Sequence, residues 1–143
     1  MFCNLNNWGH PLWCILHLLS ILINMEDIEK MKILLENLQY LIPCNKCKKN
    51  YKIKLQKYLK NGNEWRETVL NNKKILIYSL IIMHQQINIE NKKKRSSVHD
   101  YFKYWLNRRN KKKLLQIYIS NLKLCANVSE ELIFYIENIK IIE

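Results

Sequence analysis

The chain has 143 residues, which is the length of one domain, and 48% of them are hydrophobic, whereas glycine and proline number only two each. So few turn-forming residues exclude a many-stranded sheet, and an odd count of five cysteines excludes a small disulfide-stapled secreted fold, so we expect an all-α protein. A formal charge of +12 favours anionic partners but does not choose among nucleotides, nucleic acid and acidic proteins.

The first predicted helix begins near Pro11, whose fixed φ suits a first turn, and runs to about Asn24. Its apolar run at 11–23 is shorter than the ~20 residues needed to span a bilayer, so we interpret it as a buried helix. Asn24 and Asp27 form a capping-box pattern that opens a second helix, which Pro43 ends. Its apolar face consists of Ile28, Met31, Leu34, Leu35, Leu38 and Leu41.

A third helix is predicted from the cysteine pair to about Lys60, where "NGN" at 61–63 ends it. Its shared face carries Cys47, Tyr51, Leu55 and Tyr58. An isoleucine-rich fourth helix is predicted over 72–90, and Ser97 with Asp100 forms a capping box that opens a fifth helix toward Arg109. Two further helices are predicted over 111–126 and 129–140.

The segment "PCNKC" places Cys44 and Cys47 three positions apart at a predicted helix start. Backbone N–H groups and the positive end of the helix dipole stabilise a thiolate there, and Lys46, Lys48 and Lys49 add to this effect. A lowered thiol pKa favours thiol–disulfide exchange. The pair alone also fits half of a zinc site.

Two other groups share the same helical spacing. Trp13 and His17 lie four residues apart in the first helix, and His84 and Asn88 lie four apart near the end of the fourth, beside Ile87. Taken alone, each group is more typical of a core than of a binding site. Together with the cysteine pair, however, the two groups indicate a functional site rather than three unrelated features.

These motifs resemble those of the Erv/ALR flavin-linked sulfhydryl oxidases, most of all the compact members encoded by large DNA viruses. The family pattern "WG…W…LH" is "WGHPLWCILH" here, "PCxxC" is "PCNKC", and "HNxVN" followed by a lysine is "HQQIN" followed by Lys93. The resemblance covers about residues 8–93 and extends at most to 105, with Gln85 in place of the first Asn and Ile87 in place of Val.

The resemblance implies a four-helix bundle with a short fifth helix, which we place over 1–110. Residues 111–143 lie outside the resemblance, and from their two predicted helices we expect a helical C-terminal extension packed on the same domain. The resemblance also implies FAD bound beside a Cys44–Cys47 disulfide. The cofactor-binding residues would be Gly9, Trp13, His17, Cys47, His84, Ile87, Asn88 and Lys93. Among these residues, flat aromatic rings suit the ring systems of FAD, hydrogen-bond donors suit its ribose, and positive charge suits its pyrophosphate. Tyr101, Tyr104 and Trp105 are candidates for the aromatic residue beside the adenine.

The implied activity is disulfide formation in a substrate dithiol, with Cys44 attacked first, Cys47 nearer the flavin, and O2 reduced to H2O2. No second CxxC or CxC offers a shuttle, because Cys3 and Cys125 are single cysteines that could form a bridge, contact substrate or stay unpaired. The expected partner is therefore a separate thiol protein, thioredoxin-like or viral. The family also implies a homodimer and a location in host cytoplasm or the virion. The apolar runs at 11–23 and 75–83 are too short to span a bilayer, so we expect no membrane segment.

Two alternatives remain open at this stage. Cys14, His17, Cys44 and Cys47 could form a structural Cys3His zinc site, although this leaves the "HQQIN" pattern unexplained. The charge of +12 also suits a basic helical protein that binds nucleic acid, although no known DNA-reading motif is present. We assign no metal ligands and regard nucleic acid as the weaker choice of partner.

Overall fold

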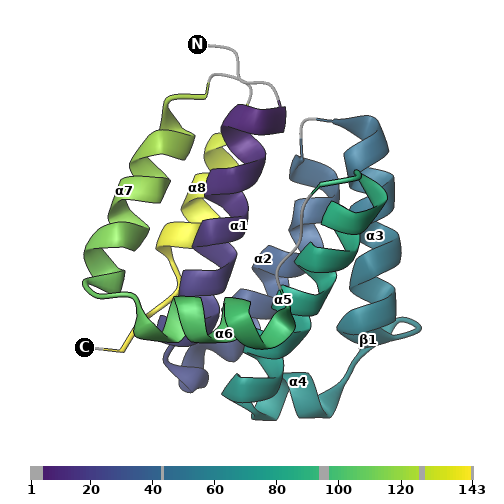
Figure 1. Ribbon diagram of the computed structural model, residues 1–143, viewed down its shortest axis with the longest axis horizontal. Helices are drawn as coiled ribbons and strands as arrows, with labels where there is room; N and C mark the ends of the chain where they lie inside the picture. The colour runs from purple at the N-terminus through teal and green to yellow at the C-terminus, as the bar shows by residue number, and fades with distance from the viewer. Residues whose placement is uncertain (1–4, 43, 94–96, 126–127, 143) are drawn as a thin grey trace.

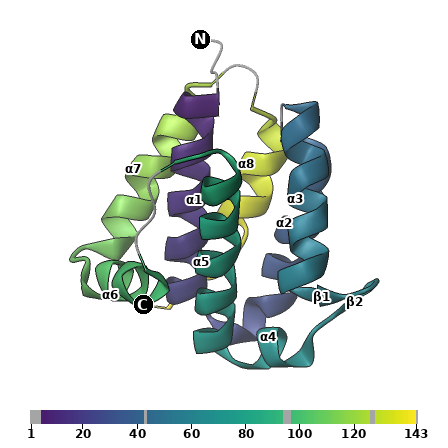
Figure 2. The ribbon, with the colours of Figure 1, turned by 45° about the vertical axis from the view of Figure 1, so that its right-hand side comes forward.

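Four long helices lie side by side in a bundle, which confirms the all-α fold class (Figures 1 and 2). They are α1 (Leu5–Leu22), α2 (Ile28–Leu41), α3 (Asn45–Tyr58) and α5 (Lys73–Glu90). The computed structural model describes residues 5–42, 44–93, 97–125 and 128–142. Within these ranges, no helix combines the length and the apolar character needed to cross a membrane.

Helix α1 begins at Leu5, so the predicted start near Pro11 is wrong. Pro11 lies inside the helix, where its ring removes an N–H donor and normally disfavours continuation. The helix continues because the side chains that follow Pro11 are almost fully buried, and packing outweighs local propensity. These core side chains are Ile15, Leu16, Leu18 and Leu19.

The link between α1 and α2 differs from the predicted capping box. Asn24 caps a short 3₁₀ turn, η1 (Met25–Asp27), and its side chain accepts from the Glu26 N–H at 3.1 Å. The Asp27 carboxylate instead accepts from the backbone N–H of Lys140 at 2.6 Å, so it secures the C-terminal segment. The capping-box prediction is therefore wrong, because a long-range partner takes the carboxylate.

The apolar face predicted for α2 is confirmed, with Met31, Leu34, Leu35 and Leu38 buried. The predicted end at Pro43 lies outside the described residues. Helix α3 is also confirmed: Cys44 precedes its first residue, and Tyr51 and Leu55 are buried on the predicted face.

Between α3 and α5 the chain forms a short hairpin of β1 (Lys60–Asn61) and β2 (Glu64–Trp65), followed by α4 (Glu67–Asn71). The sequence predicted only a break here. Gly62 makes the turn with a φ of +66°, a conformation that glycine adopts without steric cost.

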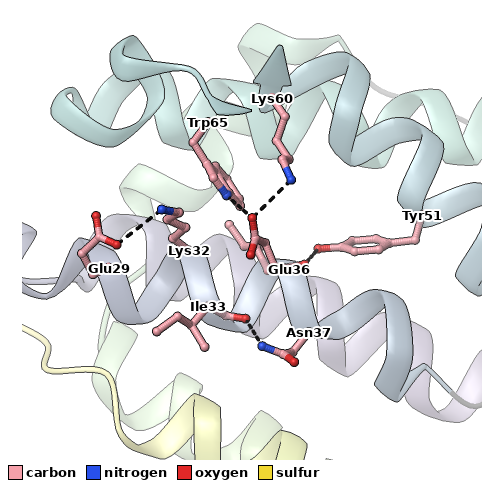
Figure 3. A network of polar contacts seen from close by, with 9 residues as sticks. Glu29, Lys32, Ile33, Glu36, Asn37, Tyr51, Lys60 and Trp65 are labelled. Carbon is pink, nitrogen blue, oxygen red and sulfur yellow. Dashed lines mark hydrogen bonds and ion pairs between the residues drawn. The ribbon is translucent and has the colours of Figure 1, made fainter. Parts of the chain in front are cut away.

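Glu36 of α2 holds this hairpin against the bundle (Figure 3). Its Oε1 accepts hydrogen bonds from the Trp65 indole N–H and from the Lys60 ammonium group, the latter at 3.2 Å. Tyr51, in the middle of α3, donates its hydroxyl to the Leu35 carbonyl of α2, so α3 and the hairpin that follows it are both tied to α2.

The remaining helices are α6 (Val98–Asn107), α7 (Lys111–Lys123) and α8 (Glu130–Glu137). The Ser97 hydroxyl accepts from the Asp100 N–H at 3.1 Å, which confirms the predicted start of α6. Helix α6 packs on α5 and α1, α7 packs along α1, and α8 packs on α2 (Figure 1). Helices α7 and α8 end before the predicted residues 126 and 140. Buried side chains from α1, α2, α3, α5, α6, α7 and α8 form one hydrophobic core.

Candidate functional site

Cys44 and Cys47 form a disulfide at the N-terminus of α3, with their Cα atoms 5.1 Å apart. Cys44 is the N-cap residue of this helix, and its Sγ accepts from the Cys47 N–H at 3.2 Å. Both cysteines are partly buried. A thiolate on Cys44 would therefore accept this helix N–H and meet the positive end of the helix dipole, and both lower a thiol pKa.

A cavity of 520 Å³, here called the disulfide cavity, opens beside this pair. Its wall includes Gly9 and Trp13 of α1, both cysteines, and Ile87 of α5. Figures 1 and 2 show why these residues meet: the start of α1, the start of α3 and the end of α5 lie at the same end of the bundle. The volume is in the range of cavities that bind small molecules.

Three rings connect α1 and α5 next to this cavity. Trp13 and His84 are stacked, with ring centroids 4.4 Å apart and planes inclined by 5°. His17 stacks on both of them at 5.8 and 5.1 Å, and a hydrogen bond of 2.9 Å joins His17 Nε2 to His84 Nδ1. The two pairs predicted from spacing, Trp13 with His17 and His84 with Asn88, thus contribute three members to one stack.

Both histidines are neutral at pH 7. Burial, followed by repulsion from His84, holds the pKa of His17 well below its usual range. Burial lowers the pKa of His84 to about 4, and the positive charges of His10 and Lys93 lower it further. Lys93 is exposed, and its backbone N–H donates to the Asn88 carbonyl at 2.8 Å. Lys93 therefore lies close enough to His84 to place positive charge near the stack.

A second cavity of 440 Å³, here called the aromatic cavity, lies on the other side of the histidines. His17 and His84 belong to its wall, together with Tyr101, Tyr104 and Trp105. Two buried polar atoms of this wall, His17 Nδ1 and Trp105 Nε1, have no hydrogen-bond partner among the described residues. Because an unsatisfied buried polar atom costs about 1–3 kcal/mol, these atoms favour a ligand with polar edges.

Cys14, His10, Tyr118 and Asp100 complete the wall of the aromatic cavity. Cys14 Sγ lies 3.5 Å from His10 Nε2, and Tyr118 of α7 hydrogen-bonds to the same sulfur. Burial raises the pKa of the Cys14 thiol to about 11, although the Tyr118 hydrogen bond and the charge of Arg108 oppose the rise. This thiol is therefore protonated at neutral pH. The spacing of His10 and Cys14 was a signal in the sequence, whereas nothing local identified Tyr118.

The other predicted site residues take varied positions. Asn88 is buried on α5 and lines neither cavity. Gln85 is buried and has an interaction partner. Cys3 lies outside the described residues, and Cys125 is buried and not a free thiol.

The four residues of the zinc alternative are divided between the two cavities. Cys14 and His17 line the aromatic cavity, whereas Cys44 and Cys47 are bonded to each other beside the disulfide cavity. In the described part of the chain, no three His, Cys, Asp or Glu side chains are grouped to hold a metal ion. The structure does not bring together the proposed Cys3His set.

Comparisons of the chain with protein-family models, with curated proteins and with solved structures find no match. The comparisons therefore show no family for this chain. Of the residues in the three motifs, Gly9, Trp13, Cys44, Cys47 and Ile87 line the disulfide cavity, and His17 and His84 line the aromatic cavity.

Proposed function

We propose that this chain is a flavin-linked thiol oxidase that forms disulfides in a substrate protein. The observation that carries the proposal is the position of the Cys44–Cys47 disulfide at a helix N-terminus in the wall of a largely apolar cavity that is open to solvent. Such a position activates sulfur for exchange and offers space for a flat redox cofactor beside it.

The side chains that line the two cavities have the chemistry that FAD binding requires. FAD needs a hydrophobic slot for its ring system and polar contacts for its nucleotide half. The disulfide cavity supplies Trp13 and Ile87, and the aromatic cavity supplies aromatic faces with two unsatisfied buried atoms, His17 Nδ1 and Trp105 Nε1. Lys93 adds positive charge near His84. These residues would hold the cofactor.

The exchange steps follow from the chemistry of the two sulfurs. One substrate thiolate attacks Cys44 Sγ, the Cys44–Cys47 bond breaks, and Cys47 leaves as a thiolate with the bond's electron pair. The second substrate thiolate attacks the substrate sulfur bound to Cys44, a new disulfide forms, and Cys44 leaves. The substrate loses two electrons and two protons: the cysteine pair gains the electrons, and the protons are released to solvent as the substrate thiols ionise.

The helix N-terminus assists the second step. Cys44 accepts the Cys47 N–H already in the disulfide form, so the negative charge that develops on its leaving sulfur has a donor in place. When bound, FAD would accept the two electrons and pass them to O2, giving H2O2. Neutral His17 and His84 would offer hydrogen bonds without adding charge to the site.

Purified protein tests the proposal directly. We expect a yellow solution that consumes O2 with dithiothreitol, and a Cys47→Ser variant that stays yellow but loses this activity. Free FAD at the same concentration serves as the control for non-enzymatic oxidation. A colourless protein, or full O2 uptake by Cys47→Ser, would contradict the proposal.

The partner, assembly and location belong to the same proposal. We propose a separate thiol protein as the substrate, thioredoxin-like or viral, and a homodimer in host cytoplasm or the virion, following the resemblance. Helices α7 and α8 already cover parts of α1 and α2, so a second copy would have to use other surfaces. Sedimentation of the purified protein measures the assembly.

A further inference from the structure

The solvent-exposed side of α3 is strongly and uniformly basic. This 14-residue helix carries six lysines and no acidic residue. Lys46, Lys49 and Lys52 are exposed, and none of the three forms an ion pair within the described part of the chain. We call these three residues the lysine stripe.

The lysine stripe borders the disulfide. Lys46 and Lys49 line the same cavity as Cys44 and Cys47. Glu90 also lines this cavity, but it is paired with Lys54, so it does not neutralise the stripe. Ile53, beside the stripe on the same cavity wall, is 52% exposed and offers an apolar contact. A molecule that approaches Cys44 from solvent therefore meets positive charge and one apolar side chain.

We propose that the lysine stripe docks an acidic polypeptide whose own cysteine pair exchanges with Cys44–Cys47. The inference rests on the proposed function because it requires this disulfide to react with dithiols. Complementary charge selects partners and accelerates their encounter. A polypeptide fits better than a nucleic acid because the site beside the stripe is a disulfide, which needs a thiol, and because Ile53 suits an apolar side chain.

The test uses oxidised protein under anaerobic conditions, so that O2 cannot re-oxidise the protein, and only the initial rate of exchange with the Cys44–Cys47 disulfide is compared. Two synthetic peptides with the same Cys-x-x-Cys core are compared, one flanked by Asp and Glu and the other by Lys and Arg. The readout is the ratio of their exchange rates. This ratio cancels any effect of a variant on the intrinsic reactivity of Cys44.

We expect the acidic peptide to react at least about tenfold faster at low salt, and the ratio to shrink at about 0.5 M salt. Lys46→Glu/Lys49→Glu should bring the ratio to about one or below. The control Lys112→Glu/Lys113→Glu makes the same change in net charge at two exposed lysines of α7 and should leave the ratio within about twofold. Thermal unfolding checks that both variants are folded.

A wild-type ratio near one would overturn the inference, as would an equal loss of discrimination in the α7 control. If the ratio is near one while duplex DNA binding depends on Lys46 and Lys49, the stripe serves nucleic acid instead and the inference is also overturned. The proposed function can fail independently of this inference. A colourless protein that still reacts faster with the acidic peptide would contradict the oxidase but support the docking surface. A flavin-containing protein that reacts equally with both peptides would support the oxidase but contradict the docking surface.

Discussion

Trp13 and His84 come from helices far apart in sequence, and their rings lie parallel with centroids 4.4 Å apart. Trp13 lines the disulfide cavity, whereas His84 lines the aromatic cavity. The stacked pair therefore lies beside both cavities and connects α1 to α5. A change at either ring should affect both stability and ligand binding.

Replacing Trp13 by Ala should lower the free energy of unfolding by about 2–4 kcal/mol, because it removes buried area and an aromatic stack. Trp13→Phe keeps an aromatic ring against His84, so its free energy of unfolding should decrease less than that of Trp13→Ala. Urea unfolding measures both, and flavin content should fall in the same order if the proposed function holds. Tyr40→Ala, at a side chain 68% exposed, is the matched control and should change neither quantity. Equal stability of Trp13→Ala and wild type would contradict this role.

The stability should decrease between about pH 6.5 and pH 4 because of His84. The unfolded side chain takes up a proton near pH 6.5, whereas in the folded chain its pKa is lowered to about 4. The unfolded state thus binds more protons in this window, so unfolding becomes easier as the pH falls, and the loss levels off below the folded pKa. The expected loss is about 3 kcal/mol.

His17, whose pKa is also lowered by burial, should add to this decrease. The variant His84→Phe can still stack on Trp13 but cannot titrate. Its unfolding free energy should therefore depend less on pH than that of the wild type. Carboxylates with lowered pKa values, such as Asp27 and Glu90, contribute to the acid slope of both proteins and cancel in the comparison. Identical slopes would show that His84 titrates normally in the folded chain.

The sequence predicted the features that depend on local spacing. The apolar face of α2 and the start of α6 at Ser97 follow from side chains three or four residues apart, and both are confirmed. The start of α1 was missed because the burial of residues beyond Pro11 decides it, not the proline itself.

The spacing of residues along the chain does not predict contacts between distant segments. The Lys140 backbone N–H donates to the Asp27 carboxylate across more than a hundred residues, and Tyr118 of α7 hydrogen-bonds to Cys14. Neither partner carries a local signal, because each is selected by how the helices pack. The cysteine pair could be predicted from the sequence, because the N-cap residue Cys44 and its disulfide partner Cys47 lie within one helical turn.

Cys14 should resist alkylation in the folded protein. With its pKa raised to about 11, only about one thiol in a thousand is ionised at pH 8, and the thiolate is the reactive form. After mild reduction, iodoacetamide should therefore label Cys44 at least about 100-fold faster than Cys14. Timed quenching and mass spectrometry measure both rates in one sample. In denaturant the two rates should converge; rapid labelling of Cys14 in the folded chain would contradict its burial.

Glu36 should matter more to stability than Glu29 on the same helix. Glu36 accepts hydrogen bonds from Trp65 and Lys60, whereas Glu29 forms an ion pair with Lys32 and its side chain is 69% exposed (Figure 3). Glu36→Ala leaves the Trp65 indole N–H without its acceptor and should cost about 1–2 kcal/mol. Glu29→Ala should have little effect, because exposed ion pairs contribute little. Thermal unfolding compares them, and equal losses would show that the hairpin does not depend on Glu36.

Cys44 has a structural role that can be separated from its redox chemistry. Its Sγ caps α3 by accepting the Cys47 N–H, and a serine hydroxyl can accept the same bond, whereas alanine cannot. Cys44→Ser and Cys44→Ala both abolish the disulfide, so their difference in unfolding free energy isolates the cap. We expect the serine variant to be more stable by about 1 kcal/mol in urea unfolding under reducing conditions. The pair Cys47→Ser and Cys47→Ala is the control and should differ less, since Cys47 lies within the helix and caps nothing. If the two Cys44 variants have the same free energy of unfolding, the sulfur does not cap the helix. The claim that this N–H stabilises a Cys44 thiolate would then also be contradicted.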